Sequence, residues 1–192
     1  MARAPSRSRA AQAWIELRAE DPEAVSALAV ARARLDQGAS LAGLRRMRVF
    51  ELRGALPRRA ALAELLHRST QFYNPAKERC TLRLAPGEPA PLGAGEVAVL
   101  VWERGGERRP AAERWLAHEA GRGAEVREGV AWALTLAGGA PAEETARDLA
   151  VARGRRHGLL SNPHFQEARI AAGKVPLPWI GSADGGPAKE EA

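Results

Sequence analysis

The stretch VAWALTL, residues 130–136, is the clearest secondary-structure signal in the chain. Large apolar side chains occupy every second position of this stretch, and smaller residues lie between them. An alternation with a period of two is typical of a β-strand whose two faces differ. We therefore predict a strand here and work outward from it.

The elements around this strand alternate between strand and helix. An extended apolar segment covers 96–103, and Arg109-Pro110 has the chemistry of a helix start. After the strand, Pro141 is expected to open a helix that runs through Leu149, and 165–170 is expected to form a last strand. The second half of the chain is thus predicted as strand, helix, strand, helix, strand.

The first half repeats this order. Strands are predicted over 13–18, 44–53 and 79–84, with one helix after Asp21-Pro22 and another opened by Pro57. The chain also matches itself at a fixed offset, which is the signature of a duplication. The matches are Trp14 with Trp102, Pro22 with Pro110 and Asn74-Pro75 with Asn162-Pro163 at 88 residues, and Gly54 with Gly138 and Pro57 with Pro141 at 84.

These patterns predict an α+β protein made of two tandem βαββαβ-type units, each an antiparallel sheet with helices on one face. The expected segments are a basic disordered tail over 1–12, units over 13–84 and 96–171, a Pro- and Gly-rich linker over 85–95, and a flexible tail over 172–192. We expect the bare sheet faces, which carry Trp14 and Trp102, to meet face to face. Trp179 and Ile180 could instead dock on a surface.

Composition favours a globular intracellular protein. Hydrophobic residues make up 45% of the chain and charged residues 27%. The single cysteine, Cys80, excludes an intrachain disulfide, as is usual in a reducing compartment. The chain has neither the roughly 20-residue apolar run of a membrane span nor the apolar region of a secretory signal. We expect a cytoplasmic protein without membrane contact.

A search for chemistry finds no catalytic residues, no metal ligands and no cofactor motif. The four histidines show no ligand spacing, and a Walker-type phosphate loop is absent. Cys80 with His67 as its base would be a nucleophile pair. However, Cys80 falls on the apolar side of its predicted strand, where it is interpreted as a small hydrophobic residue. The chain is therefore not expected to have an active site of its own.

Three motifs nevertheless resemble those of a known family. They are Asp21-Pro22 after the first strand, the sequence RVFEL at 48–52, and the sequence LLSNP at 159–163. In this order they are similar to the PurS small subunit of phosphoribosylformylglycinamidine synthase, and the resemblance spans 13–171 as a tandem duplicate. The glycine that the family usually carries shortly after Asp-Pro is absent, since Glu23 follows, and the Gly-Lys usual after Arg-Val is absent, since Phe50 and Glu51 follow.

The resemblance implies a PurS-like pseudo-dimer and a non-catalytic role in de novo purine biosynthesis. Such a subunit bridges an ATP-dependent synthase subunit and a glutaminase subunit, so that ammonia passes between them as part of a ligase complex. The interface residues that it suggests are the arginines and the Asn-Pro turns, namely Arg46, Arg48, Asn74 and Asn162. Self-association is left open.

Two alternatives are kept. The net charge of +6 would suit a basic α+β RNA-binding module with Trp14 and Trp102 exposed on a sheet face. Against it, the arginines are scattered among acidic residues, so nucleic acid is not the expected partner. The other alternative is a ligand-sensing protein, which requires a pocket between the two units.

Overall fold

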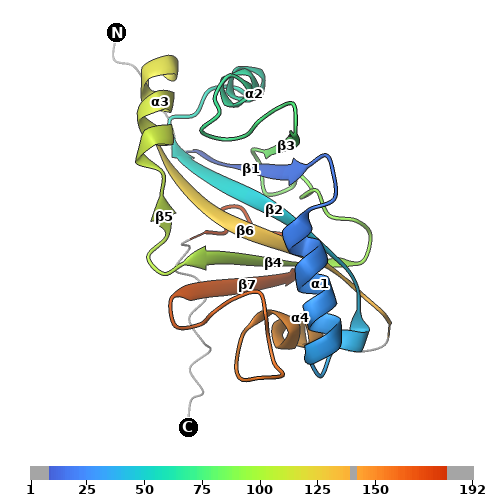
Figure 1. Cartoon of the computed structure of the whole chain (residues 1–192). Helices are drawn as coiled ribbons and strands as arrows, with labels where there is room; N and C mark the ends of the chain where they lie inside the picture. The colour runs from blue at the N-terminus through green and yellow to red at the C-terminus, as the bar shows by residue number, and fades with distance from the viewer. Residues whose placement is uncertain (1–8, 139–141, 181–192) are drawn as a thin grey trace.

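The computed structural model describes residues 9–138 and 142–180, which form one antiparallel seven-stranded sheet with four α-helices (Figure 1). The strands are β1 (Arg9–Leu17), β2 (Leu41–Gly54), β3 (Glu78–Arg83), β4 (Glu96–Glu103), β5 (Glu107–Arg108), β6 (Ala124–Leu136) and β7 (Gln166–Ala172). The helices are α1 (Pro22–Arg34), α2 (Arg59–His67), α3 (Pro110–Ala120) and α4 (Ala142–Ala150), with a short 3-10 turn over Gly38–Ser40. Within these residues no helix has the length and apolar character that a bilayer crossing requires.

The predicted α+β class is confirmed, and both halves follow the order strand, helix, strand, helix, strand. Each half has three main strands, whereas the predicted βαββαβ unit has four. The second half also contains the two-residue strand β5. The N-terminal signal of α1 is also confirmed, because the Asp21 carboxylate accepts a hydrogen bond from the Glu23 amide at 2.8 Å. Pro141, which was expected to open α4, lies outside the described residues.

The two halves join edge to edge rather than face to face. The strand order is β3-β1-β2-β6-β4-β7, and β2 pairs with β6 from Leu41↔Leu136 to Gly54↔Ala124. The expected meeting of two sheets is therefore wrong. β2 and β6 would otherwise be edge strands with unpaired backbone N–H and C=O groups. By forming hydrogen bonds with each other, they join the two halves into one continuous sheet.

Hydrogen bonds fix which residues of the two halves correspond. The Arg18 side chain donates to the carbonyl of Pro75, and Arg104, 86 residues later, donates in the same way to Pro163. With this offset, Trp14 corresponds to Leu100 rather than to Trp102. The sequence match at 88 was therefore misplaced by two residues in this strand. A slip of two keeps the sheet face, so the inferred faces were unaffected.

The pairing registers of the strands show which residues of β2 and β6 correspond to each other. Ile15 pairs with Arg48, and its counterpart Val101 pairs with Val130. Arg48 and Val130 are therefore counterparts, and they also pair with each other across the junction. An approximate two-fold axis thus passes through the sheet at this pair.

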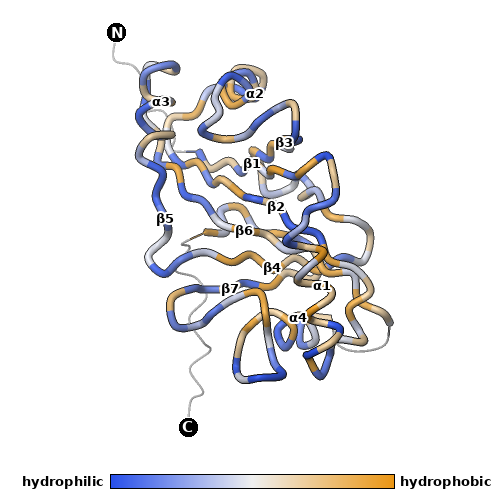
Figure 2. Tube along the Cα trace, viewed as in Figure 1, coloured by the Kyte–Doolittle hydropathy of each residue, from blue (hydrophilic) through white to orange (hydrophobic). Residues whose placement is uncertain are grey.

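The helices cover one face of the sheet in two groups. Helices α2 and α3 pack over one end, in a cluster that includes Ile15, Phe50 and Leu116. Helices α1 and α4 pack over the other end, where Ala31 and Trp132 belong to one cluster. Each group combines one helix from each half. In Figure 2 β4 is coloured mainly as hydrophobic, in keeping with its burial between two covered faces, whereas the short β5 is hydrophilic.

The opposite sheet face is covered by the segment 173–180, which we call the docked tail. Trp179 and Ile180 are buried against Trp14 and Trp102, and the rings of Trp14 and Trp179 lie 6.3 Å apart. Up to residue 180 the tail expected to be flexible is therefore packed, as the docking alternative proposed. The apolar face that was expected to contact a second sheet is covered by the chain's own end.

A buried polar network fixes the docked tail. The Glu51 side chain is fully buried, and its carboxylate accepts hydrogen bonds from the amides of Trp179 at 2.6 Å and Ile180 at 3.1 Å. The Arg83 guanidinium, also buried, donates to Gln12 at 2.6 Å and to the Val175 carbonyl at 2.9 Å. Burial lowers the pKa of Arg83 from its ordinary value. Since buried charges require partners, this network specifies where the tail lies.

Replacing Gly129 by alanine is expected to destabilise the protein. A Cβ at this position would lie 2.9 Å from the Val101 carbonyl oxygen and 3.3 Å from the Ile180 side chain. Overpacking of this kind costs about 1–3 kcal/mol. Urea denaturation would measure the loss. Gly123→Ala is the matched control, because nothing lies within 4 Å of its added Cβ. Equal stability of the two variants would contradict the close contact.

Glu51→Gln is expected to loosen the docked tail. Hydrogen bonds to a charged acceptor contribute about 1.5–3 kcal/mol, and the neutral amide weakens both bonds to the tail. Hydrogen exchange at the Trp179 and Ile180 amides should then accelerate by more than about tenfold. Glu167→Gln, an exposed acid on the same sheet face, should leave the exchange rates unchanged.

Candidate functional site

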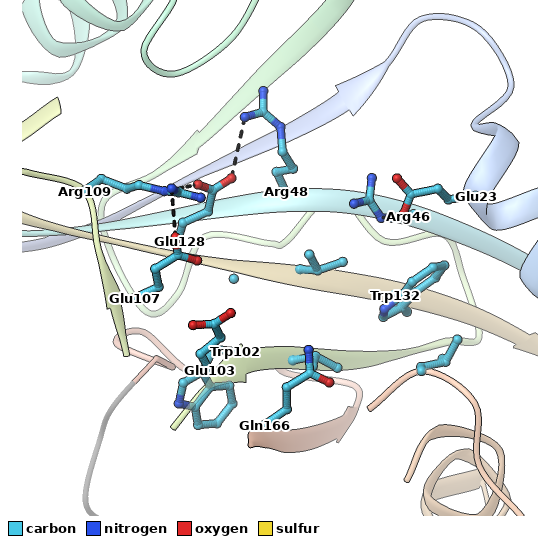
Figure 3. A pocket seen from close by; sticks show the side chains of 14 residues that line it. Glu23, Arg46, Arg48, Trp102, Glu103, Glu107, Arg109, Glu128, Trp132 and Gln166 are labelled. Atoms are coloured by element: carbon cyan, nitrogen blue, oxygen red, sulfur yellow. Dashed lines mark hydrogen bonds and ion pairs between the residues drawn. The ribbon is translucent and has the colours of Figure 1, made fainter. Parts of the chain in front are cut away.

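The helix-covered face is open between the two helix groups, and a cavity of about 390 Å³ lies there. We call it the central cavity. It lies over the junction of the two halves, with Arg46 and Arg48 from β2 and Val130 and Trp132 from β6 among its lining residues (Figure 3). The pocket between units that the ligand-sensing alternative requires is therefore present.

Arg48 forms the wall of the central cavity on the first-half side. Its guanidinium donates to the Phe72 carbonyl at 2.9 Å and to the Glu78 carboxylate at 3.0 Å. A second nitrogen lies 3.5 Å from Glu128. Three acceptors thus hold this guanidinium at the edge of the cavity.

Arg46 is fixed at the start of helix α1. It lies 3.1 Å from Glu23 and 3.5 Å from Asp21, and its guanidinium carbon is 5.9 Å from the centre of the Trp132 ring. Both arginines were interpreted as exposed interface residues, but both are half-buried and paired within the chain. They shape the cavity and are not free cations on the surface.

The second-half wall has a different character. Glu103 and Gln166 line the cavity here, and Figure 3 shows both on the other side of β6 from Arg46 and Arg48. Glu103 is exposed, and its side chain has no ion pair or hydrogen bond within 9–138 and 142–180. Glu128, by contrast, is paired with both Arg48 and Arg109, and Arg109 also contacts Glu107 at 2.8 Å. One carboxylate of the cavity is therefore left without a cation.

The two Asn-Pro turns precede β3 and β7, the two edge strands of the sheet. Asn74 is exposed, and its side-chain oxygen accepts the Ala76 amide at 3.0 Å, while Asn162 accepts the His164 amide at the same distance. The Asn74 amide donates to Glu78, the acid that holds Arg48, and the Asn162 amide donates to Gln166. The asparagine side chains thus fold their own turns, as a structural interpretation of the motif predicts.

The structure therefore brings two of the four predicted site residues together: Arg46 and Arg48 line the central cavity, whereas Asn74 and Asn162 are not among its lining residues. Sequence reasoning missed Glu103, Glu128, Gln166 and Trp132. The available signal was Glu103 itself, an acid at the end of an apolar strand. That Glu103 lies in the cavity depends on how β4 pairs with β6 and β7, and this pairing is known only from the structure.

His67 and Cys80, the two residues considered as a nucleophile pair, each have contacts within the fold. His67 contacts the Tyr73 hydroxyl at 3.0 Å, and Cys80 packs against the core beneath α2. Across 9–138 and 142–180 no three His, Cys, Asp or Glu side chains are grouped to hold a metal ion.

The RNA-binding alternative required exposed aromatic residues on a sheet face. Trp14 and Trp102 are only 1% and 3% exposed, because the docked tail covers them. A stacking surface for bases is therefore not available on this face.

Comparison with known proteins gives no assignment: no family model, no curated protein and no solved structure matches this chain. Any functional argument must therefore rest on the geometry and on the motifs.

Cys80 is expected to react slowly with thiol reagents. Burial raises its pKa to about 11, so only about one thiol in a thousand is ionised at pH 8. Alkylation by iodoacetamide should be more than about a hundredfold slower than in the urea-unfolded chain, and the rate should rise about tenfold per pH unit from 8 to 10. A rate at pH 8 that matches the unfolded chain would contradict this burial.

Proposed function

We propose that this protein is a non-catalytic bridging subunit of a phosphoribosylformylglycinamidine synthase complex. The observation that carries the proposal is the covalent pseudo-dimer: two equivalent halves joined through β2 and β6 in one sheet. The family that the motifs resemble forms dimers, and a tandem duplicate is the single-chain form of that arrangement. The bridge would act in the cytoplasm in purine biosynthesis.

The surface of the two turns is suited to two different partners. In the second half, Leu159 and Phe165 flank the Asn162 turn and are 39% and 53% exposed. Their counterparts 88 residues earlier are Gln71 and Lys77, both polar. One end of the molecule therefore presents an apolar turn and the other a polar turn, as a bridge between two unlike subunits requires.

The physical contribution of such a bridge is proximity. Ammonia released by a glutaminase subunit reaches an ATP-dependent synthase subunit without dilution when both are held in fixed orientation. The chain needs no reactive group for this role. It needs a rigid body with two distinct binding surfaces. The backbone hydrogen bonds between β2 and β6 hold the two halves in a fixed relative position.

Reconstitution with the synthase and glutaminase subunits of the same source tests the proposal. Product formation from glutamine should depend on this chain, because ammonia must be transferred, whereas product formation from added ammonium chloride should not. Phe165→Ser should weaken co-purification of one partner by at least about tenfold, since exposed aromatic residues carry much of the energy of an interface.

Val30→Ser is the matched control, because Val30 is also a large exposed apolar residue, at 44%, but belongs to α1 and to neither turn. It should leave complex formation unchanged. Glutamine-dependent activity that is the same with and without this chain would refute the bridging function.

A further inference from the structure

The first half of the protein has a guanidinium group at a position where the second half has none. In the first half, the Arg48 guanidinium lies between the Phe72 carbonyl and the Glu78 carboxylate. The counterpart of Arg48 is Val130, as the strand ladders establish. The cation present on one side of the pseudo-two-fold axis is thus missing on the other.

Of the two acceptors, the backbone carbonyl remains at Leu160, whereas the Glu78 carboxylate is replaced by the Gln166 amide, whose oxygen accepts the Asn162 amide. Leu160 and Gln166 stand 88 residues after Phe72 and Glu78, and the turns between them carry the same hydrogen bonds. Both residues line the central cavity, as does Val130. The cavity therefore occupies the place where the first half holds its own guanidinium.

One change of charge in the second half leaves a carboxylate without a partner. Glu103 stands 86 residues after Leu17, so an acid replaces an apolar residue at this position. Glu128 is likewise the counterpart of Arg46, 82 residues earlier. Arg48 and Arg109 neutralise Glu128, whereas Glu103 has no cation within the described part of the chain. Asp21 and Glu78 are in turn replaced by Arg109 and Gln166, so Glu103 is the change among these that leaves a carboxylate without a cation.

We propose that the central cavity binds a guanidinium group supplied from outside the chain. The guanidinium lies against the Glu103 carboxylate and the Leu160 backbone carbonyl, the counterpart of the Phe72 carbonyl that holds Arg48, and its aliphatic stem lies along Val101 and Val130. A planar cation that pairs with a carboxylate and donates to further oxygens matches this set of acceptors. The volume of about 390 Å³ is in the range of small-ligand sites. This inference does not depend on the bridging function.

Titration calorimetry with 1-butylguanidinium tests the proposal, with 1-butylurea as a neutral ligand of the same shape. We expect the cation to bind at least about tenfold more tightly than the urea, because only the cation compensates Glu103. Glu103→Leu, which restores the first-half residue, should reduce the affinity for the cation by at least about tenfold.

Val130→Arg supplies the missing guanidinium from within and should abolish binding. Glu167→Leu, the same kind of change on the opposite sheet face, should leave the affinity unchanged. No binding of butylguanidinium at 1:1 stoichiometry, or equal affinity in the wild type and in Glu103→Leu, would overturn the proposal.

The guanidinium could belong to a free metabolite or to an arginine of a polypeptide. The peptide acetyl-Gly-Arg-Gly-amide separates the two sources. Tighter binding than butylguanidinium indicates an arginine side chain, because the peptide backbone then adds contacts at the rim. Weaker binding indicates a small molecule. Both results retain the cation site, and a peptide that binds equally well after Glu103→Leu contradicts it.

Discussion

The pairing of β2 with β6 is the constraint on which the rest of the structure depends. These strands turn two three-stranded units into one sheet, and each helix group then covers strands of both halves. Neither half has a complete core without the other: Ala31 of α1 belongs to the same cluster as Val99 and Trp132. The two helix groups leave the middle of the sheet open, so the central cavity is a direct consequence of this joining.

The same pairing explains why the other face needs a cover. A sheet formed edge to edge has a single large apolar face on its far side, and that face must be buried. The docked tail provides the cover, and Glu51 fixes its position. Burying a carboxylate is costly unless it is hydrogen-bonded, and here the backbone amides of Trp179 and Ile180 supply the bonds. Glu51 thus specifies the site at which the apolar tail residues pack.

Sequence patterns predicted the elements well because alternation reports directly on which face is buried. The strand over 96–103 was placed at its observed bounds, whereas the first part of β6, 124–129, was missed because it lacks the run of large apolar residues found in 130–136. Hydrophobic alternation does not show which strand edges pair, so it could not distinguish face-to-face from edge-to-edge joining of the two halves.

Alternation also does not determine the register between the two halves. The match of Trp14 with Trp102 gave the correct sheet face, but it concealed that Glu103 is the counterpart of Leu17. Arg46 and Arg48 were located as site residues, but their ion pairs depend on contacts distant in sequence.

A covalent pseudo-dimer can acquire properties that a symmetric dimer cannot. In a homodimer every substitution appears on both sides of the axis, so a cation lost from one half-site is lost from the other as well. In a duplicated chain each half changes independently. Arg48 could therefore keep its structural role beside Glu78 while its counterpart became Val130. The filled half-site stabilises the junction, and the empty half-site is free to bind. The same reasoning applies to the turns, where Lys77 and Phe165 have diverged to polar and apolar surfaces at equivalent positions. Duplication within one chain thus accounts for both asymmetries.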